Sequence, residues 1–116
     1  MRFGALCFST DRSVRPDELA RDVEEAGFAT LLFPDHTHVP VHLESAWPGG
    51  GELPESYARI FDPFVAMSWA LAATTDLIVG TGVALAAQRD PIVTAKQVAS
   101  IDLLSGGRTV IGIGAG

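Results

Sequence analysis

The stretch LIVGTGV at residues 77–83 is the clearest indication of the fold, because such a run of apolar and small residues is typical of a buried strand. A helical segment follows, from Asp90-Pro91 to Gly106-Gly107, and a second apolar run, TVIGI, occupies residues 109–113. Strands that alternate with helices indicate a parallel sheet with helices packed against it. The sequence therefore predicts an α/β fold.

The same alternation extends back to the N-terminus. Two short apolar runs, FGALCF at residues 3–8 and TLLF at 30–33, are typical of buried strands. A helix is predicted between them, opening at Arg15-Pro16 and stopping at Gly27. Another helix is predicted from Asp62-Pro63, where aspartate can cap the free N–H groups and proline needs no donor. Its residues, FVAMSWALAA, are apolar nearly all round, so we expect this helix to be deeply packed.

Four strands and three helices in this order predict the N-terminal half of a TIM-type (β/α)8 barrel. A complete barrel needs roughly 200–250 residues, and this chain has 116. We therefore treat residues 1–116 as one partial barrel domain, which would carry only part of a barrel's active site. Its first and fourth strands would be open edges, and open edges invite pairing with another chain.

Helical periodicity places certain apolar residues together. In the first helix, three residues share one face: Leu19, Val23 and Ala26. In the third helix, four residues form one stripe: Ile92, Ala95, Ala99 and Leu103.

Composition narrows the range of partners and compartments. The chain has 8 basic and 14 acidic residues, a net charge of −6, and no basic cluster, so we expect neither nucleic acid nor an anionic membrane surface as partner. The single cysteine, Cys7, can form no internal disulfide and is interpreted as a small buried hydrophobe. No signal peptide and no apolar run of about 20 residues is present. These features predict a cytoplasmic protein without a membrane span.

One connection is much longer than the others and contains three prolines and a Gly-Gly-Gly run. This loop, about residues 36–61, follows the C-terminal end of a strand, the face on which α/β barrels carry their active sites. We interpret it as a substrate lid, although a tolerated surface insertion has the same signature. Three aromatic residues could line an apolar wall there or simply pack over the barrel: Trp47, Tyr57 and Phe61.

Asp35 and His36 end the second predicted strand and are the candidate catalytic residues. Histidine titrates near neutral pH and can pass a proton or stabilise a developing charge, but a polar residue beginning a loop would look the same. Residues 36–38, His-Thr-His, also resemble the paired histidines of metal-dependent hydrolases. Such enzymes need further ligands from later strands, so we predict no metal site.

Glycines mark the ends of the third and fourth predicted strands. Gly82 beside Val83 can mark a bulge or a strained peptide. GIGAG at residues 112–116 is similar to the start of a dinucleotide-binding fingerprint, but close packing, or approach of the backbone to a ligand, is the preferred interpretation. Arg89 could bind an anion, and we interpret it instead as a solvated loop arginine.

Two segments make a more specific resemblance. EEAGFATLLFPDH at residues 24–36, and residues 61–116 with their GTGV, RDP, AKQVASIDLLSGGR and GIGAG motifs, resemble the N-terminal part of the luciferase-like monooxygenase superfamily. Within it, the chain is most similar to the coenzyme F420-dependent oxidoreductases. The resemblance covers essentially the whole chain, whereas members of the family are more than twice as long.

The resemblance implies a (β/α)8 barrel that binds a deazaflavin, or alternatively FMN, at the C-terminal ends of its strands. It implies that His36 donates or accepts a proton, or hydrogen-bonds an oxygen where charge develops, and that Asp35 orients the region. It places a non-proline cis peptide at Gly82-Val83 against the cofactor ring, with Gly114 as a further cofactor contact. Some relatives carry a catalytic acid where this chain has Gly114-Ala115-Gly116, so that acid is absent here.

The implied chemistry is hydride transfer between coenzyme F420 and an unidentified small organic substrate. With FMN, the implied chemistry is instead activation of dioxygen and insertion of one oxygen atom. A third hypothesis is a non-catalytic half-barrel that works by pairing with itself, as a homodimer, or with another half.

Overall fold

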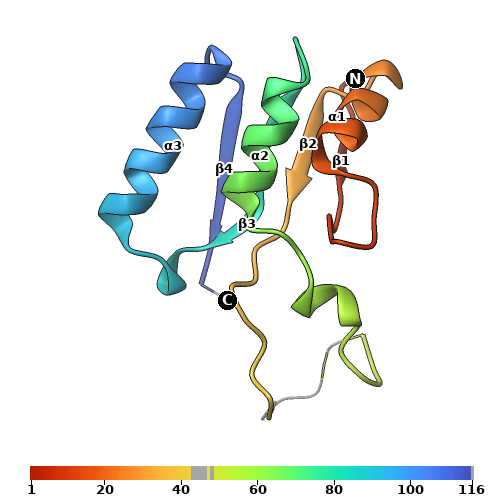
Figure 1. The fold of residues 1–116 in the computed structure, drawn as a ribbon, viewed down its shortest axis with the longest axis vertical. Helices are drawn as coiled ribbons and strands as arrows, with labels where there is room; N and C mark the ends of the chain where they lie inside the picture. Colours follow the sequence, from red (N-terminus) through yellow and green to blue (C-terminus); the bar gives the residue numbers. More distant parts are fainter. Residues whose placement is uncertain (43–46, 48, 116) are drawn as a thin grey trace.

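The computed structural model describes residues 1–42, 47 and 49–115, which form one parallel sheet covered by three α-helices (Figure 1). The strands are β1 (Gly4–Leu6), β2 (Thr30–Phe33), β3 (Ile78–Leu85) and β4 (Thr109–Gly114). The α-helices are α1 (Pro16–Glu25), α2 (Pro63–Ala72) and α3 (Pro91–Ser105), with short 3-10 helices η1 (Glu55–Ala58) and η2 (Ala86–Gln88). The predicted order of four strands and three helices is confirmed.

The sheet has the order β1-β2-β3-β4, and every neighbouring pair is parallel. Consecutive strands are therefore neighbours, with a helix in each of the connections that join them, which is the arrangement of a (β/α) barrel. The pairing of β3 with β4 shifts in register between Thr81 and Ala84, so the irregularity predicted at Gly82 and Val83 is present.

The helix boundaries lie where the capping residues predict them. The Asp62 carboxylate accepts hydrogen bonds from the backbone N–H groups of Phe64 and Val65, and Asp90 accepts one from Val93. After α1 the chain reverses at Gly27, whose φ of 82° is in the left-handed region that favours glycine.

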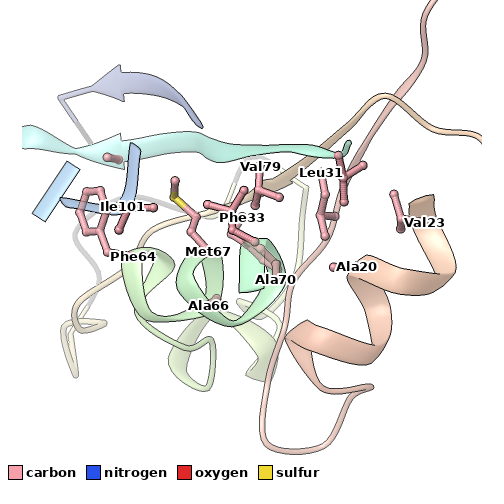
Figure 2. Packing of buried hydrophobic residues seen from close by; sticks show 13 residues of the cluster. Ala20, Val23, Leu31, Phe33, Phe64, Ala66, Met67, Ala70, Val79 and Ile101 are labelled. Atoms are coloured by element: carbon pink, nitrogen blue, oxygen red, sulfur yellow. The ribbon is translucent and has the colours of Figure 1, made fainter. Parts of the chain in front are cut away.

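The hydrophobic core lies between the helices and one face of the sheet. Figure 2 shows Leu31, Phe33 and Val79 from the strands facing Met67 and Ala70 of α2. All five side chains are nearly inaccessible to water. The opposite face of the sheet is exposed in part, with Leu6 51%, Val83 42% and Val110 43% accessible. The sheet therefore has one packed face and one open face.

One expectation about helix packing is corrected, and the apolar stripe of α3 lies away from the core. The stripe of α3 formed by Ile92, Ala95, Ala99 and Leu103 is exposed, and Val98 and Ile101 pack on the core instead. Periodicity finds residues that share a face, but it does not say which of two apolar faces meets the sheet. Helix α2 is deeply packed only on one side, because Val65 and Trp69 are about half exposed. In α1, Val23 is buried as predicted, whereas Ala26 is exposed.

Arg108, just before β4, fastens the end of α2 to the sheet. Its guanidinium donates to the backbone carbonyls of Leu71 and Leu77 and to the Thr74 hydroxyl, at 2.9–3.1 Å. The last carbonyl groups of a helix have no partner within the helix. Arg108 supplies a partner for one of them and holds the start of β3 at the same time.

Glu24, near the end of α1, holds the turn that leads into β3. One carboxylate oxygen, Oε1, accepts hydrogen bonds from the backbone N–H groups of Thr75, Asp76 and Leu77, at 2.7–3.1 Å. These hydrogen bonds, with that from Asp76 the strongest, lower the pKa of Glu24 below its usual value. The charged carboxylate therefore stabilises the folded chain.

Replacing Glu24 with alanine is expected to lower the free energy of unfolding by about 1.5–3 kcal/mol at pH 7, the range for hydrogen bonds to a charged group. Because the pKa is lowered on folding, this contribution is present above the unfolded pKa of about 4.3 and is lost as the pH falls through the folded pKa. Urea denaturation at pH 7 and at lower pH measures it. Exposed Glu25 is the matched control, and an equal effect of Glu25→Ala would contradict the role given to Glu24.

Candidate functional site

The candidate site lies at the C-terminal ends of the strands. In Figure 1 the arrowheads of β2 and β4 point toward the end of the molecule where the segment between β2 and α2 lies, together with η1. Asp35 and His36 follow β2, Gly82 and Val83 lie near the end of β3, and Gly114 ends β4. All five predicted site residues are therefore at the same edge of the sheet, which is the edge that carries the active site in α/β barrels.

Asp35 is buried and fully engaged by other residues of the chain. Its side chain is 1% accessible. Oδ2 accepts hydrogen bonds from the Leu85 backbone N–H at 2.9 Å and from Arg89 Nε at 2.7 Å, and Oδ1 accepts one from Arg89 Nη2 at 2.7 Å. This bidentate geometry is the strongest form of an arginine–carboxylate pair. Asp35 thus connects the end of β2 to the end of β3.

Arg89 is not a solvated loop arginine, which corrects the sequence-based interpretation. Its side chain is only 11% accessible. Besides Asp35 it pairs with Asp62 Oδ2 at 2.9 Å, and its guanidinium lies over the Phe64 ring, 4.8 Å from the centroid. Arg89 therefore binds two carboxylates of its own chain, which come from the end of β2 and the start of α2.

Asp35 and Arg89 keep each other in their charged forms. Burial opposes the charge on Asp35, but the hydrogen bonds from Arg89 and from the Leu85 N–H outweigh burial and lower the pKa of Asp35 below its usual value. The hydrogen bond to Asp35, followed by that to Asp62, raises the pKa of Arg89. Asp35 is therefore a poor proton donor or acceptor near neutral pH.

His36 lies half-buried beside an aromatic cluster. Its ring centroid is 5.0 Å from that of Tyr57, which lies in η1, and the two planes are inclined by 58°. Tyr57 also packs on Phe8 at 5.0 Å and on Trp47 at 6.4 Å. Such tilted pairs are favourable arrangements of aromatic rings. The long connection thus folds Tyr57 back onto the residue predicted to be catalytic.

The residues that follow His36 contact the connection after β3. The Thr37 hydroxyl donates to Gln88 Oε1 at 2.6 Å and lies 2.9 Å from His38 Nδ1. Within residues 1–42, 47 and 49–115, no group of three or more His, Cys, Asp or Glu side chains could hold a metal ion. The His-Thr-His pattern thus has no supporting ligands in this part of the chain.

Glycines at the ends of β3 and β4 contribute to an apolar surface on which only a few side chains project. The Gly82–Val83 peptide bond is cis, as the resemblance implies. A Cβ at Gly82 would meet the Leu6 side chain at 2.9 Å, and a Cβ at Gly114 would meet Val83 Cγ2 at 2.7 Å. These glycines let neighbouring groups approach closely, which agrees with the packing interpretation of GIGAG.

This surface is apolar and open to solvent. Leu6 and Val83 are half exposed, and the glycines beside them present backbone without side chains. A ring system such as a flavin or deazaflavin could lie on this surface with an apolar face toward Val83. Arg89 supplies no free positive charge for a phosphate tail, because Asp35 and Asp62 already neutralise it. The residues present therefore fit the ring of such a cofactor and give its tail no cationic anchor at Arg89.

Sequence reasoning missed three residues that shape the site: Tyr57 as a contact of His36, and Gln88 and Arg89 as anchors of the loop after β2. Tyr57 was noted only as a wall of the loop, and Arg89 only as a loop cation. No local signal pointed to the role of Arg89, because its partners Asp35 and Asp62 lie 54 and 27 residues away in the sequence. Nothing in the sequence indicates Gln88.

The sequence of this chain matches a known family. The profile of the luciferase-like monooxygenase family matches residues 1–116. The chain therefore belongs to the luciferase-like monooxygenase family.

Individual relatives agree with this assignment. An uncharacterised protein of Mycobacterium tuberculosis (strain H37Rv) is 41% identical over 119 residues, which cover 100% of this chain and 42% of that protein. The 5,10-methylenetetrahydromethanopterin reductase of Methanopyrus kandleri is 32% identical over 100 residues, 79% of this chain and 28% of the reductase. The chain spans less than half the length of these relatives.

Solved structures share the fold. The coenzyme F420-dependent tetrahydromethanopterin reductase of M. kandleri superposes with a TM-score of 0.70 at 24% identity, covering 99% of this chain and 27% of that one. The oxygenating constituent of 3,6-diketocamphane monooxygenase of Pseudomonas putida, in complex with FMN, gives 0.74 at 17% identity, with 100% and 30% covered. The four strands and three helices are therefore the N-terminal half of a TIM-type barrel, as predicted.

Within the described residues, no helix is both long enough and apolar enough to cross a bilayer.

Proposed function

We propose that this chain supplies the N-terminal part of the active site of a deazaflavin-dependent oxidoreductase, which transfers hydride between coenzyme F420 and a small organic substrate. The observation that carries the proposal is that half-buried His36 and the apolar surface of Leu6, Val83 and Gly114 lie at the same edge of the sheet. The methylenetetrahydromethanopterin reductase among the relatives supports the deazaflavin over FMN.

The bound cofactor would supply the hydride chemistry, which no amino-acid side chain provides. Val83 and the backbone at Gly82 and Gly114 would support the ring face. His36 would donate or accept a proton at the substrate oxygen or nitrogen where charge changes. Tyr57 packs on the imidazole and limits its movement, and Asp35 fixes the backbone that carries His36. In this proposal the chain contributes one proton-transfer group, His36, and one apolar surface that supports the cofactor ring.

An FMN-dependent monooxygenase is the second candidate, and the likeness to the FMN complex of the diketocamphane enzyme favours it. The same apolar surface would support the FMN ring. The cofactor therefore has to be identified by binding.

Titrating the purified chain with coenzyme F420 and with FMN, followed by ring absorbance or fluorescence, is the first test. We expect weak binding that is tighter for the deazaflavin, because Arg89 offers the tail of the cofactor no free positive charge. Gly114→Val should weaken it at least about tenfold, or 1.4 kcal/mol, because a Cβ there lies 2.7 Å from Val83 Cγ2 and displaces the side chain under the ring. Ala115→Val, one residue further and exposed, is the matched control.

Equal binding by Gly114→Val would contradict this placement of the ring. Tighter binding of FMN would favour the monooxygenase. A folded chain that binds neither ring and forms a stable dimer would favour the non-catalytic half-barrel.

A further inference from the structure

The residues on both sides of His36 are held by two adjacent residues of the connection between β3 and α3. Asp35 is bound by Arg89 through two hydrogen bonds of 2.7 Å, and the Thr37 hydroxyl is bound to Gln88 at 2.6 Å. In sequence these pairs are 54 and 51 residues apart, so only the parallel arrangement of β2 and β3 brings them together. The two neighbours of His36, Asp35 and Thr37, are therefore held by the adjacent residues Arg89 and Gln88.

Arg89 also holds the far end of the long connection. Asp62, the N-terminal cap of α2, is 2.9 Å from Arg89 Nη2, while Asp35 stands at the beginning of the same connection. One guanidinium therefore fixes both ends of the segment that carries His36 and Tyr57. A planar guanidinium with several donors can make these contacts simultaneously, whereas a lysine ammonium cannot reproduce the bidentate geometry.

The same network reaches the surface proposed for the ring. Asp35 Oδ2 accepts the Leu85 N–H, Leu85 is two residues beyond Val83, and it pairs in register with Gly114 of β4. Movement of Asp35 would therefore change the position of His36 relative to Val83 and Gly114.

We propose that Gln88 and Arg89 are positioning residues, which hold His36 in a fixed place relative to the Val83 surface by binding the residues before and after it. That Gln88 and Arg89 hold His36 in place is inferred from the contacts alone. The consequence for turnover rests on the proposed function. Neither residue is proposed to touch the substrate. Their effect on catalysis is through His36, because small displacements of a catalytic group cost much of its contribution.

The test measures the order of His36 by NMR in the cofactor-free protein. Gln88→Ala, at an exposed position, removes the hydrogen bond to the Thr37 hydroxyl. Arg89→Lys keeps the positive charge but loses the two parallel hydrogen bonds to Asp35. Gln97→Ala, an exposed glutamine of α3, is the matched control. Circular dichroism establishes that each variant is folded, so that a local change is separated from unfolding.

We expect the backbone order parameter of His36 to fall from about 0.85, typical of rigid backbone, to below about 0.6 in Gln88→Ala and in Arg89→Lys. Nuclear Overhauser effects between the His36 and Tyr57 rings should weaken in the same variants and remain in Gln97→Ala. An unchanged order parameter and unchanged ring contacts in both folded variants would overturn the inference.

In the catalytically competent protein, Gln88→Ala should lower kcat by about 10- to 10²-fold with KM changed less than about threefold. A reduced order parameter with unchanged kcat would leave the positioning in place and contradict the catalytic role of His36. The NMR measurement therefore tests the positioning of His36, and the kinetic measurement tests the proposed function, so the two can be contradicted independently.

Discussion

Replacing His36 with alanine in the catalytically competent protein is expected to lower kcat by about 10²–10⁴-fold, the usual contribution of a positioned acid–base group. The dissociation constant of the cofactor should change far less, because the surface proposed for the ring is formed by Val83, Gly82 and Gly114 rather than by the imidazole. The expectation follows from the position of His36 at the end of β2 and from its fixed neighbours on both sides. Steady-state turnover and a separate cofactor titration measure the two effects.

A second substitution separates the two roles that His36 could have. His36→Gln keeps a hydrogen-bond donor but cannot transfer a proton near neutral pH. Partial recovery of turnover relative to alanine would indicate stabilisation of charge, and no recovery would indicate proton transfer. His42→Ala, six residues further and exposed, is the control that should leave turnover near the original value. Equal turnover in His36→Ala would remove His36 from the mechanism.

Replacing Asp35 with asparagine is expected to lower the free energy of unfolding by about 3–5 kcal/mol at pH 7, the cost of removing one partner of a buried ion pair. The asparagine keeps the shape of the side chain but leaves Arg89, which is 11% accessible, without its bidentate partner. Urea denaturation followed by circular dichroism measures the loss. The exposed pair of Arg12 and Glu55 provides a control, since Glu55→Gln should cost less than about 1 kcal/mol.

The stability that Asp35 contributes is also expected to depend on pH. The pKa of Asp35 is lower in the folded chain than its unfolded value of about 3.9, so its contribution is complete above that value. It is lost as the pH falls through the folded pKa. The difference in stability between the original chain and Asp35→Asn should therefore shrink below about pH 4. A difference that stays constant down to acid pH would contradict the ionised pair.

Local features of the sequence determined much of the fold. Asp62-Pro63 and Asp90-Pro91 predicted the starts of α2 and α3, and Gly27 the end of α1, because caps depend on contacts between residues a few positions apart. The alternation of apolar runs with these helices predicted the parallel sheet. The resemblance to the luciferase-like family implied that Asp35 and Val83 would both lie near the cofactor, at the C-terminal ends of the strands.

Some features required the tertiary structure. Whether the exposed stripe of α3 or the side with Ile101 faces the sheet depends on how the whole layer packs, and both sides carry apolar residues. Similarly, nothing local shows that Tyr57, 21 residues after His36, returns to pack on its ring. A long connection has many ways to close, and the aromatic contacts select one of them.

The sequence by itself determined which residues stand at the strand ends, including Asp35 and His36, because strand ends are fixed by local pattern. Only the tertiary structure decided what Arg89 does. Its partners, Asp35 and Asp62, lie 54 and 27 residues away, and a loop arginine without them would be solvated. The physical reason is that an ion pair across such distances forms only after the sheet has brought β2 and β3 together and α2 has packed against them.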